Sequence, residues 1–222
     1  MIGSSHFLAW LAAVYLATCG GTARTPPPPA PSPAPVTRPG WVDLSVRIPD
    51  AVLDIRYATA DNFTGVVLYP VARCLLRAEV AERLAAAADA LRAKGHRLLL
   101  WDCYRPASIQ RELWRRVPDP NYVAEPTFDD AGQPVDGSKH SRGAAVDVSL
   151  TDLAGTPRVM PTAHDDFRPE ASGDTATGLA ARNHATLRAA MVAAGFATVP
   201  TEWWHYDAGN WATYPLADEP LD

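Results

Sequence analysis

The longest helical pattern in the chain lies in residues 77–94. In this segment Val80, Leu84, Ala87 and Leu91 recur at i, i+4, i+7 and i+11, which is the spacing of one face of an α-helix. A glycine follows the segment, and glycine is a common helix terminator. The pattern therefore predicts an amphipathic helix that packs its aliphatic stripe against a core.

Two further patterns predict strands. Residues 96–102, HRLLLWD, are short and continuously apolar, which favours a buried strand over a surface helix. Residues 144–150 alternate instead, so Asp147 should point away from the face that carries Val146 and Val148. The other predicted elements are helices over residues 107–116 and 177–194, strands over 42–44, 52–57 and 202–206, and a long loop over 117–139. Elements mixed without a regular βαβ rhythm predict an α+β fold, a single compact domain with a mostly antiparallel sheet flanked by helices.

The first forty residues differ in composition from the rest. Residues 7–17 form an apolar run of signal-peptide length, so we expect residues 1–18 to be a signal peptide of the lipoprotein type. Cys19 is then the lipidated first residue of an exported, periplasmic protein; the alternative is a secretory signal cut nearby, with Cys19 incidental. Residues 19–40 are rich in proline, which favours an extended tether. Residues 41–222 show no second linker and should form the catalytic domain.

Charge and cysteine usage narrow the set of partners. The formal net charge is -5 at pH 7, and no basic cluster alternates with aromatic residues, so we expect no nucleic acid partner. Contact with a membrane is expected only through the lipid anchor. Besides Cys19, the chain contains Cys74 and Cys103. An even pair in an exported protein favours a disulfide, and two buried free thiols are the alternative.

Two short motifs carry candidate metal ligands. SKHSRGAAVD places His140 and Asp147 seven residues apart, and EWWH places Glu202 three residues before His205. Two imidazoles and one carboxylate are three protein ligands for Zn²⁺, which leaves the fourth tetrahedral position open, as hydrolytic sites require. Glu202 is the spare carboxylate, suited to act as general base on an attacking water. Taken singly, each histidine would more often be a hydrogen-bonded structural residue.

Together these motifs resemble the SxHxxGxxxD and ExxH motifs of zinc D,D-peptidases, and in particular the vancomycin-resistance D-alanyl-D-alanine dipeptidases. The resemblance covers residues 51–206 and includes YATADNFTG at 57–65, LLLWDCYRP at 98–106, DDF at 165–167, and Asn183 through Gly195 and Phe196. It implies the α+β fold of that group, which Hedgehog signalling domains share. It also implies one Zn²⁺ per chain and hydrolysis of a small D,D-dipeptide, D-alanyl-D-alanine, to two D-alanine.

The resemblance also assigns roles to individual residues. Arg105 matches the arginine that stabilises the developing oxyanion; the alternative is a structural ion pair with a neighbouring aspartate. Asp166 matches the carboxylate that receives the substrate ammonium; the alternative is a surface acid. Ser138 matches the contact to the substrate carboxylate, and Tyr57 and Tyr69 match aromatic walls of the small pocket.

Two other functions fit the same motifs. A D,D-carboxypeptidase that acts on peptidoglycan stem peptides shares the zinc motifs, but it needs an open cleft rather than a pocket that holds the substrate ammonium. A catalytically silent zinc-binding module shares the ligands, although the presence of both Glu202 and Arg105 argues against it. The remaining histidines, His96, His164 and His184, match no ligand motif and are expected to be structural or exposed.

Overall fold

The structure is a computed structural model that describes residues 38–222. These residues are organised around a five-stranded sheet. The predicted signal peptide, Cys19 and the proline-rich residues before 38 lie outside the described residues. The strand order is β2 (Val52–Leu53), β4 (His96–Asp102), β7 (Ala145–Asp152), β9 (Glu202–Ala208) and β8 (Phe196–Val199). Only the β2–β4 pair is parallel within this sheet. The predicted α+β domain with a mostly antiparallel sheet is confirmed.

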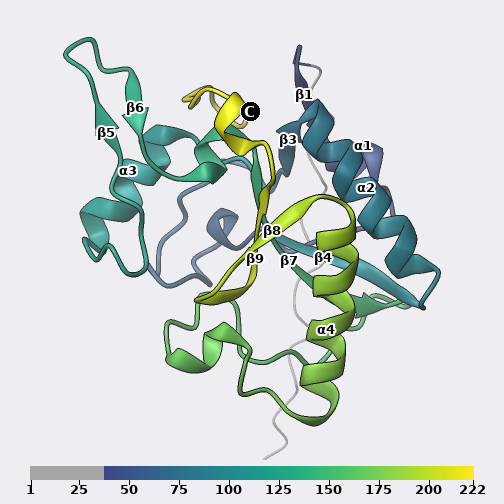
Figure 1. The fold of residues 1–222 in the computed structure, drawn as a ribbon. Coiled ribbons are helices and arrows are strands. Elements are labelled where there is room, and N and C mark those ends of the chain that lie inside the picture. Colours follow the sequence, from purple (N-terminus) through teal and green to yellow (C-terminus); the bar gives the residue numbers. More distant parts are fainter. Residues whose placement is uncertain (1–37) are drawn as a thin grey trace, which may run out of the picture. The chain divides into compact units, whose positions relative to one another are not determined.

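Two long helices pack on this sheet (Figure 1). Helix α2 (Ala78–Arg92) contacts β4, and α4 (Gly178–Ala193) contacts β8 and β7. The two helices also contact each other. The aliphatic stripe predicted for α2 is buried at each of its four positions, because it is the face that α2 turns toward the sheet. None of the helices in residues 38–222 is long and apolar enough to cross a membrane.

Shorter elements complete the domain. They are α1 (Leu44–Arg47), α3 (Ala107–Arg116), the pairs β1 (Trp41–Asp43) with β3 (Leu75–Arg77) and β5 (Thr127–Phe128) with β6 (Pro134–Asp136), and the 3₁₀ turns η1 (Arg56–Ala58), η2 (Lys139–Arg142), η3 (Pro169–Ser172) and η4 (Trp211–Thr213). The strand predicted over 52–57 is wrong beyond β2, since η1 follows. The loop predicted over 117–139 contains the β5–β6 hairpin, whose strands are too short to show periodicity.

Strand β7 is buried on both faces. Val146 and Val148 are fully buried in the core, as the alternation predicts. Asp147 and Ser149 on the opposite face are also buried, but each of them lines a cavity. The central strand therefore separates a packed apolar layer from a polar layer that can carry chemistry.

Cys74 and Cys103 form a disulfide, in line with the expected pairing. Their Cα atoms lie 5.1 Å apart and both residues are buried. The bridge joins the segment before β3 to the residue that follows β4. A loop with a sequence separation of 29 residues contributes roughly 3 to 4 kcal/mol in the chain-entropy model. The disulfide thus fixes the end of the strand that leads to Arg105.

Candidate metal centre and substrate cavity

Three neighbouring strands place one residue each in a single row. Asp147 on β7 pairs with Asp102 on β4 and with His205 on β9. Side chains directly opposite each other on adjacent antiparallel strands have Cβ atoms about 4.5 to 5.5 Å apart. The register of the sheet therefore brings Asp147 and His205 together, although 58 residues separate them in the sequence.

The turn η2 presents His140 to this row. The Ser138 hydroxyl accepts a hydrogen bond from the backbone N–H of His140, at 3.2 Å, and caps the turn. Gly143 ends the turn with φ of 65°, and a Cβ atom there would lie 2.3 Å from a ring carbon of Trp41. Only glycine suits both the positive φ and the close approach. The serine and the glycine of the first motif are thus needed to place His140.

The three predicted ligands converge on one point. His205 Nδ1 lies 3.0 Å from Asp147 Oδ1 and 3.2 Å from His140 Nε2. His140 Nε2 lies 3.4 Å from Asp147 Oδ1. Ligand atoms of all three residues fall within 4.8 Å of one another, so the structure brings together the residues that the two motifs proposed.

The outer ring nitrogen of each imidazole is bound to an oxygen acceptor. His140 Nδ1 lies 2.7 Å from the carbonyl oxygen of Cys103, and His205 Nε2 lies 2.9 Å from Asp207 Oδ1. Since a carbonyl and an ionised carboxylate only accept hydrogen bonds, these outer nitrogens carry the hydrogens. The inner nitrogens then face each other with lone pairs, an arrangement that a cation stabilises. The donor set fits a divalent metal such as zinc, with ligands oriented as metal sites usually orient them.

The charges in the row also favour a cation. Burial alone raises the pKa of Asp147, but His140 and hydrogen bonds to His164 and His205 outweigh it and hold that pKa well below its usual range. Burial lowers the pKa of His205, yet its hydrogen bonds to Asp147 and Asp207 raise it to about 10. The surroundings therefore stabilise a positive charge beside an ionised Asp147, and a bound metal would supply that charge.

A strand irregularity turns Glu202 toward the same point. In a regular strand, positions 202 and 205 would face opposite sides. The β8–β9 register shifts between Thr198 and Val199, which pair with Tyr206 and Glu202, and such bulges re-aim side chains. Glu202 Oε2 lies 3.7 Å from His205 Nδ1. Burial raises the pKa of Glu202, and within residues 38–222 no group donates a hydrogen bond to this carboxylate.

Arg105 is both an ion-pair partner and a cavity residue. Its Nε donates to Asp102 Oδ2 at 2.9 Å, and its Nη1 donates to Gln110 Oε1 at 2.7 Å. Asp102 is fully buried and also accepts a hydrogen bond from the Tyr69 hydroxyl at 2.6 Å. These contacts fix the guanidinium with donors to spare, because arginine has five N–H groups. The structural ion pair and the proposed catalytic position are therefore compatible.

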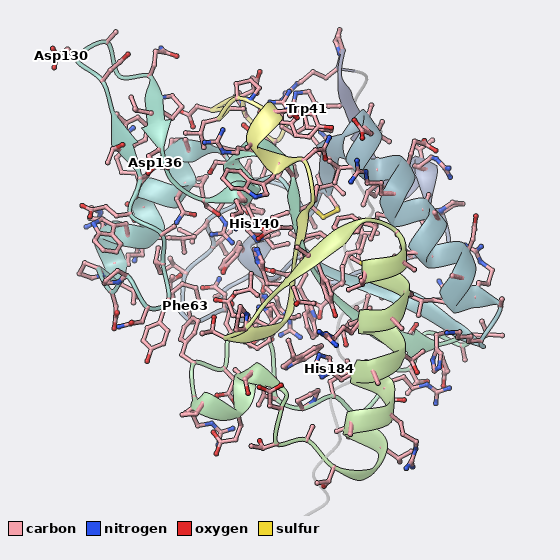
Figure 2. The ribbon with its side chains drawn as sticks, viewed as in Figure 1. Trp41, Phe63, Asp130, Asp136, His140 and His184 are labelled. Carbon is pink, nitrogen blue, oxygen red and sulfur yellow. A yellow bond between two sulfur atoms is a disulfide. The ribbon has the colours of Figure 1, made fainter. Side chains whose placement is uncertain are left out.

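These groups share a small cavity. It has a volume of about 220 Å³ and contains the three ligands, Glu202 and Arg105 in its lining. Ser138 and Tyr57 line it as well, as expected. Cavities for drug-sized ligands span about 300 to 1,000 Å³, so this cavity suits a smaller molecule. His140 lies in the interior of the domain (Figure 2).

Comparison with known proteins identifies the family. The chain matches the peptidase M15 family model, described as D-ala-D-ala dipeptidase, over residues 37–220. This chain belongs to that family. It is 38% identical over 177 residues to the D-alanyl-D-alanine dipeptidase of Escherichia coli strain K12, covering 79% of this chain and 88% of that protein. It is 36% identical to the D-alanyl-D-alanine dipeptidases of Enterococcus faecium, over 75% of this chain and 86% of that protein, and of Streptomyces coelicolor, over 69% and 83%.

One substrate residue expected from the resemblance lies elsewhere in this member of the dipeptidase family. Tyr69 is fully buried and does not line the cavity. Its hydroxyl is bound to Asp102 and its ring packs on Tyr57 at 5.5 Å between centroids. Tyr69 therefore supports Asp102 and Tyr57 from behind rather than forming the pocket wall.

The predicted position of Asp166 also needs correction. Its carboxylate accepts hydrogen bonds from Arg168, including one from Nε at 2.8 Å, and it does not line the cavity. Asp165 lines the cavity instead, with Oδ2 3.2 Å from the Tyr57 hydroxyl. The backbone of Asp165 has φ of 55°, a left-handed conformation that aspartate tolerates better than most residues. This local turn decides which of two adjacent carboxylates faces inward, and sequence comparison missed it.

The dipeptidase site contains one histidine that sequence motifs did not identify. The side chain of His164 is only 4% exposed, with Nε2 3.3 Å from Asp147 Oδ2 and Nδ1 3.4 Å from Asp165 Oδ2. Its ring packs on Trp101 at 4.8 Å between centroids. His164 is thus structural, as expected, but it also contacts a metal ligand. No spacing in the sequence indicates this contact, because His164 lies on a loop whose path the sequence pattern does not reveal.

Proposed function

We propose that this chain is a zinc-dependent dipeptidase that hydrolyses D-alanyl-D-alanine to two molecules of D-alanine. The observation that supports this most strongly is the convergence of His140, Asp147 and His205 beside Glu202 and Arg105 in one cavity of about 220 Å³. The names of the relatives, D-alanyl-D-alanine dipeptidase in each case, give the substrate.

His140, Asp147 and His205 would hold one zinc ion per chain. Zinc bound there supplies a Lewis acid that polarises a carbonyl and makes water acidic near neutral pH. The partners behind the imidazoles keep their inner nitrogens free of hydrogen, so the ligands need not reorganise to bind the ion.

Glu202 acts as the general base. Its carboxylate takes a proton from the attacking water and returns it to the departing amine. Two features suit it to this role: it lies beside the ligand His205 at 3.7 Å, and no residue of the described chain donates a hydrogen bond to it. The rise of its pKa on burial brings its basicity closer to that of a base working near neutral pH.

Arg105 stabilises the negative charge that develops on the carbonyl oxygen. A guanidinium remains protonated under all working conditions, so it needs no proton transfer of its own. Asp102 and Gln110 orient it from the protein side, and the cavity receives its remaining donors. Such preorganised donors contribute because they need not reorient during the reaction.

Asp165 binds the substrate ammonium, in place of Asp166. Burial raises the pKa of Asp165, although His164 and Arg105 act in the opposite direction, so an additional positive charge would favour the ionised carboxylate. A substrate ammonium would supply such a charge in a confined site. Ser138 and Tyr57 line the same cavity, where Ser138 would contact the substrate carboxylate and Tyr57 would wall the pocket.

A steady-state assay against D,D-, L,D- and L,L-dipeptides tests this function. We expect kcat/KM to be highest for D-alanyl-D-alanine, and we expect activity to vanish with a chelator and return with zinc. Preference for an L,L-dipeptide, or turnover that a chelator leaves intact, would contradict the proposal.

The chain's location is a separate proposal that depends on residues 1–40 alone. The protein is exported to the periplasm and anchored through a lipid on Cys19, with the proline-rich segment as tether. Cys19→Ala should then move the exported protein from the membrane fraction to the soluble fraction. Membrane association that survives this substitution would refute the anchor without affecting the proposed activity.

A further inference from the structure

Two aromatic rings separate the catalytic cavity from a neighbouring hollow. Tyr122 and Phe167 line the cavity of about 220 Å³, and they also line a second cavity of about 320 Å³. The second cavity reaches Arg168, Pro169, Pro200 and Thr201. The two rings are stacked, with centroids 4.3 Å apart and an interplanar angle of 29°. Apart from Glu202, no other residue lines both cavities among those described. We call this stacked pair the aromatic wall.

Two further rings connect the aromatic wall to Asp165. The Tyr57 hydroxyl lies 3.2 Å from Asp165 Oδ2, and the Tyr57 ring meets Phe63 edge-on at 6.1 Å. Phe63 in turn meets Phe167 edge-on at 5.2 Å. Phe63, marked in Figure 2, is less buried than His140. A continuous set of rings therefore runs from the carboxylate to the wall, and all of these rings line the cavity of about 220 Å³.

The aromatic wall is attached lightly to the rest of the domain. Tyr122 lies on the loop after α3 and is 41% exposed. Phe167 lies between Asp166 and Arg168, whose side chains are ion-paired at the surface. Because neither ring belongs to the sheet or the helix layer, removal of one ring should open the cavity without disturbing the core.

We infer that Tyr122 and Phe167 are specificity-determining residues that limit the substrate to two residues. This inference rests on the proposed function, which places the substrate ammonium at Asp165. A peptide extended at its amino end would have to pass the aromatic wall. Without the wall, the cavities of about 220 and 320 Å³ join, and a peptide of the form X-D-alanyl-D-alanine fits. The reaction is unchanged: water is added across the same D-alanyl-D-alanine bond, and D-alanine leaves.

The test compares Tyr122→Ala and Phe167→Ala with wild type on two substrates, D-alanyl-D-alanine and glycyl-D-alanyl-D-alanine. The readout is the ratio of kcat/KM for tripeptide over dipeptide. We expect each alanine variant to raise this ratio at least about tenfold, the lower end of what one pocket contact contributes to discrimination.

Two further variants serve as controls. Tyr122→Phe keeps the stacked ring. Phe128→Ala removes a partly buried aromatic that contacts Arg111 in the β5 region, outside both cavities. Both should leave the ratio within about twofold of wild type, because Tyr122→Phe keeps the stacked ring and Phe128 lies outside both cavities.

The outcomes separate the two proposals. If wild type hydrolyses the dipeptide and the alanine variants leave the ratio unchanged, the aromatic wall does not set specificity, although the proposed function stands. If wild type does not hydrolyse D-alanyl-D-alanine, the proposed function fails and this inference fails with it. An alanine variant without turnover is tested by tripeptide binding in a Glu202→Gln background, where its Kd should fall at least about tenfold; an unchanged Kd would overturn the inference.

Discussion

The two strands that hold Asp147 and His205 and the loops that border the cavity differ in how their side chains are supported. On the strands, His205 is bound to Asp207 and Asp147 contacts His164, and the exposed fractions of these side chains lie between 4% and 13%. On the loops, Tyr122 is 41% exposed and the side chain of Arg168, which pairs with Asp166, is 70% exposed.

The difference indicates that the strands and the loops have different roles in function. Functional side chains on rigid elements can be held within the narrow tolerances that metal binding and proton transfer require. Loops tolerate change more readily and usually carry selectivity. We therefore expect substitutions of His140, Asp147 or His205 to abolish hydrolysis. Substitutions in the loops should change which substrate is accepted.

The largest effect of a single charge-neutralising change should come from the base. Glu202→Gln keeps the shape of the side chain but removes its basicity, so kcat should fall by about 10² to 10⁴. Zinc content should stay at the wild-type level, because Glu202 is not a ligand. Turnover and metal content measured on the same sample check this. A zinc-loaded variant with near-normal kcat would show that another group is the base.

A smaller effect is expected from the carboxylate at the cavity end. Asp165→Asn removes the proposed counter-charge of the substrate ammonium, and the loss of one partner in a desolvated pair costs about 2 kcal/mol or more. The kcat/KM for D-alanyl-D-alanine should fall more than about tenfold, since 1.4 kcal/mol is a factor of ten.

Asp166→Asn is the matched control for this prediction. Surface ion pairs contribute little, so kcat/KM should stay within about threefold of wild type. The reverse order, with Asp166→Asn the more damaging change, would restore the assignment that the sequence alone suggested.

The support behind a ligand should affect zinc affinity rather than the chemical step. Asp207 accepts a hydrogen bond from His205 through Oδ1, and its Oδ2 forms an ion pair with Lys139 Nζ at 2.6 Å. Asp207→Asn should weaken zinc binding about 10- to 100-fold, the usual cost of losing such a partner. Competition with a chromogenic chelator measures the affinity. Asp136→Asn, on the exposed hairpin strand β6, is the control and should leave it unchanged.

The sequence predicted the fold where patterns were long. The stripe of α2 and the apolar run of β4 extend over enough residues for their periodicity to be read, and α3 matches its predicted bounds of 107–116. The hairpin β5–β6 and the turn η1 were missed, because segments of two to four residues carry no period. Their conformations depend on tertiary contacts that no local pattern reports.

The site divides in the same way. The ligands and Glu202 were predicted because their spacing places them on one turn and two adjacent strands. Asp166 and Tyr69 were expected to line the cavity but do not. The contacts of Asp165 and His164 with the site were not predicted, because these residues lie on segments whose direction depends on backbone turns. The φ of 55° at Asp165 is one such turn. A pair of adjacent aspartates in a sequence does not reveal which one faces a cavity.

The most direct test of the central claim is a zinc titration of the metal-free enzyme. D-alanine release from D-alanyl-D-alanine should be absent before zinc is added, rise in proportion to zinc, and saturate at one equivalent per chain, because His140, Asp147 and His205 form a single three-ligand site. His205→Ala, treated in parallel, should gain no activity at one equivalent. Hydrolysis by the metal-free protein, or equal activity in His205→Ala, would contradict the assignment of this row as the catalytic metal centre.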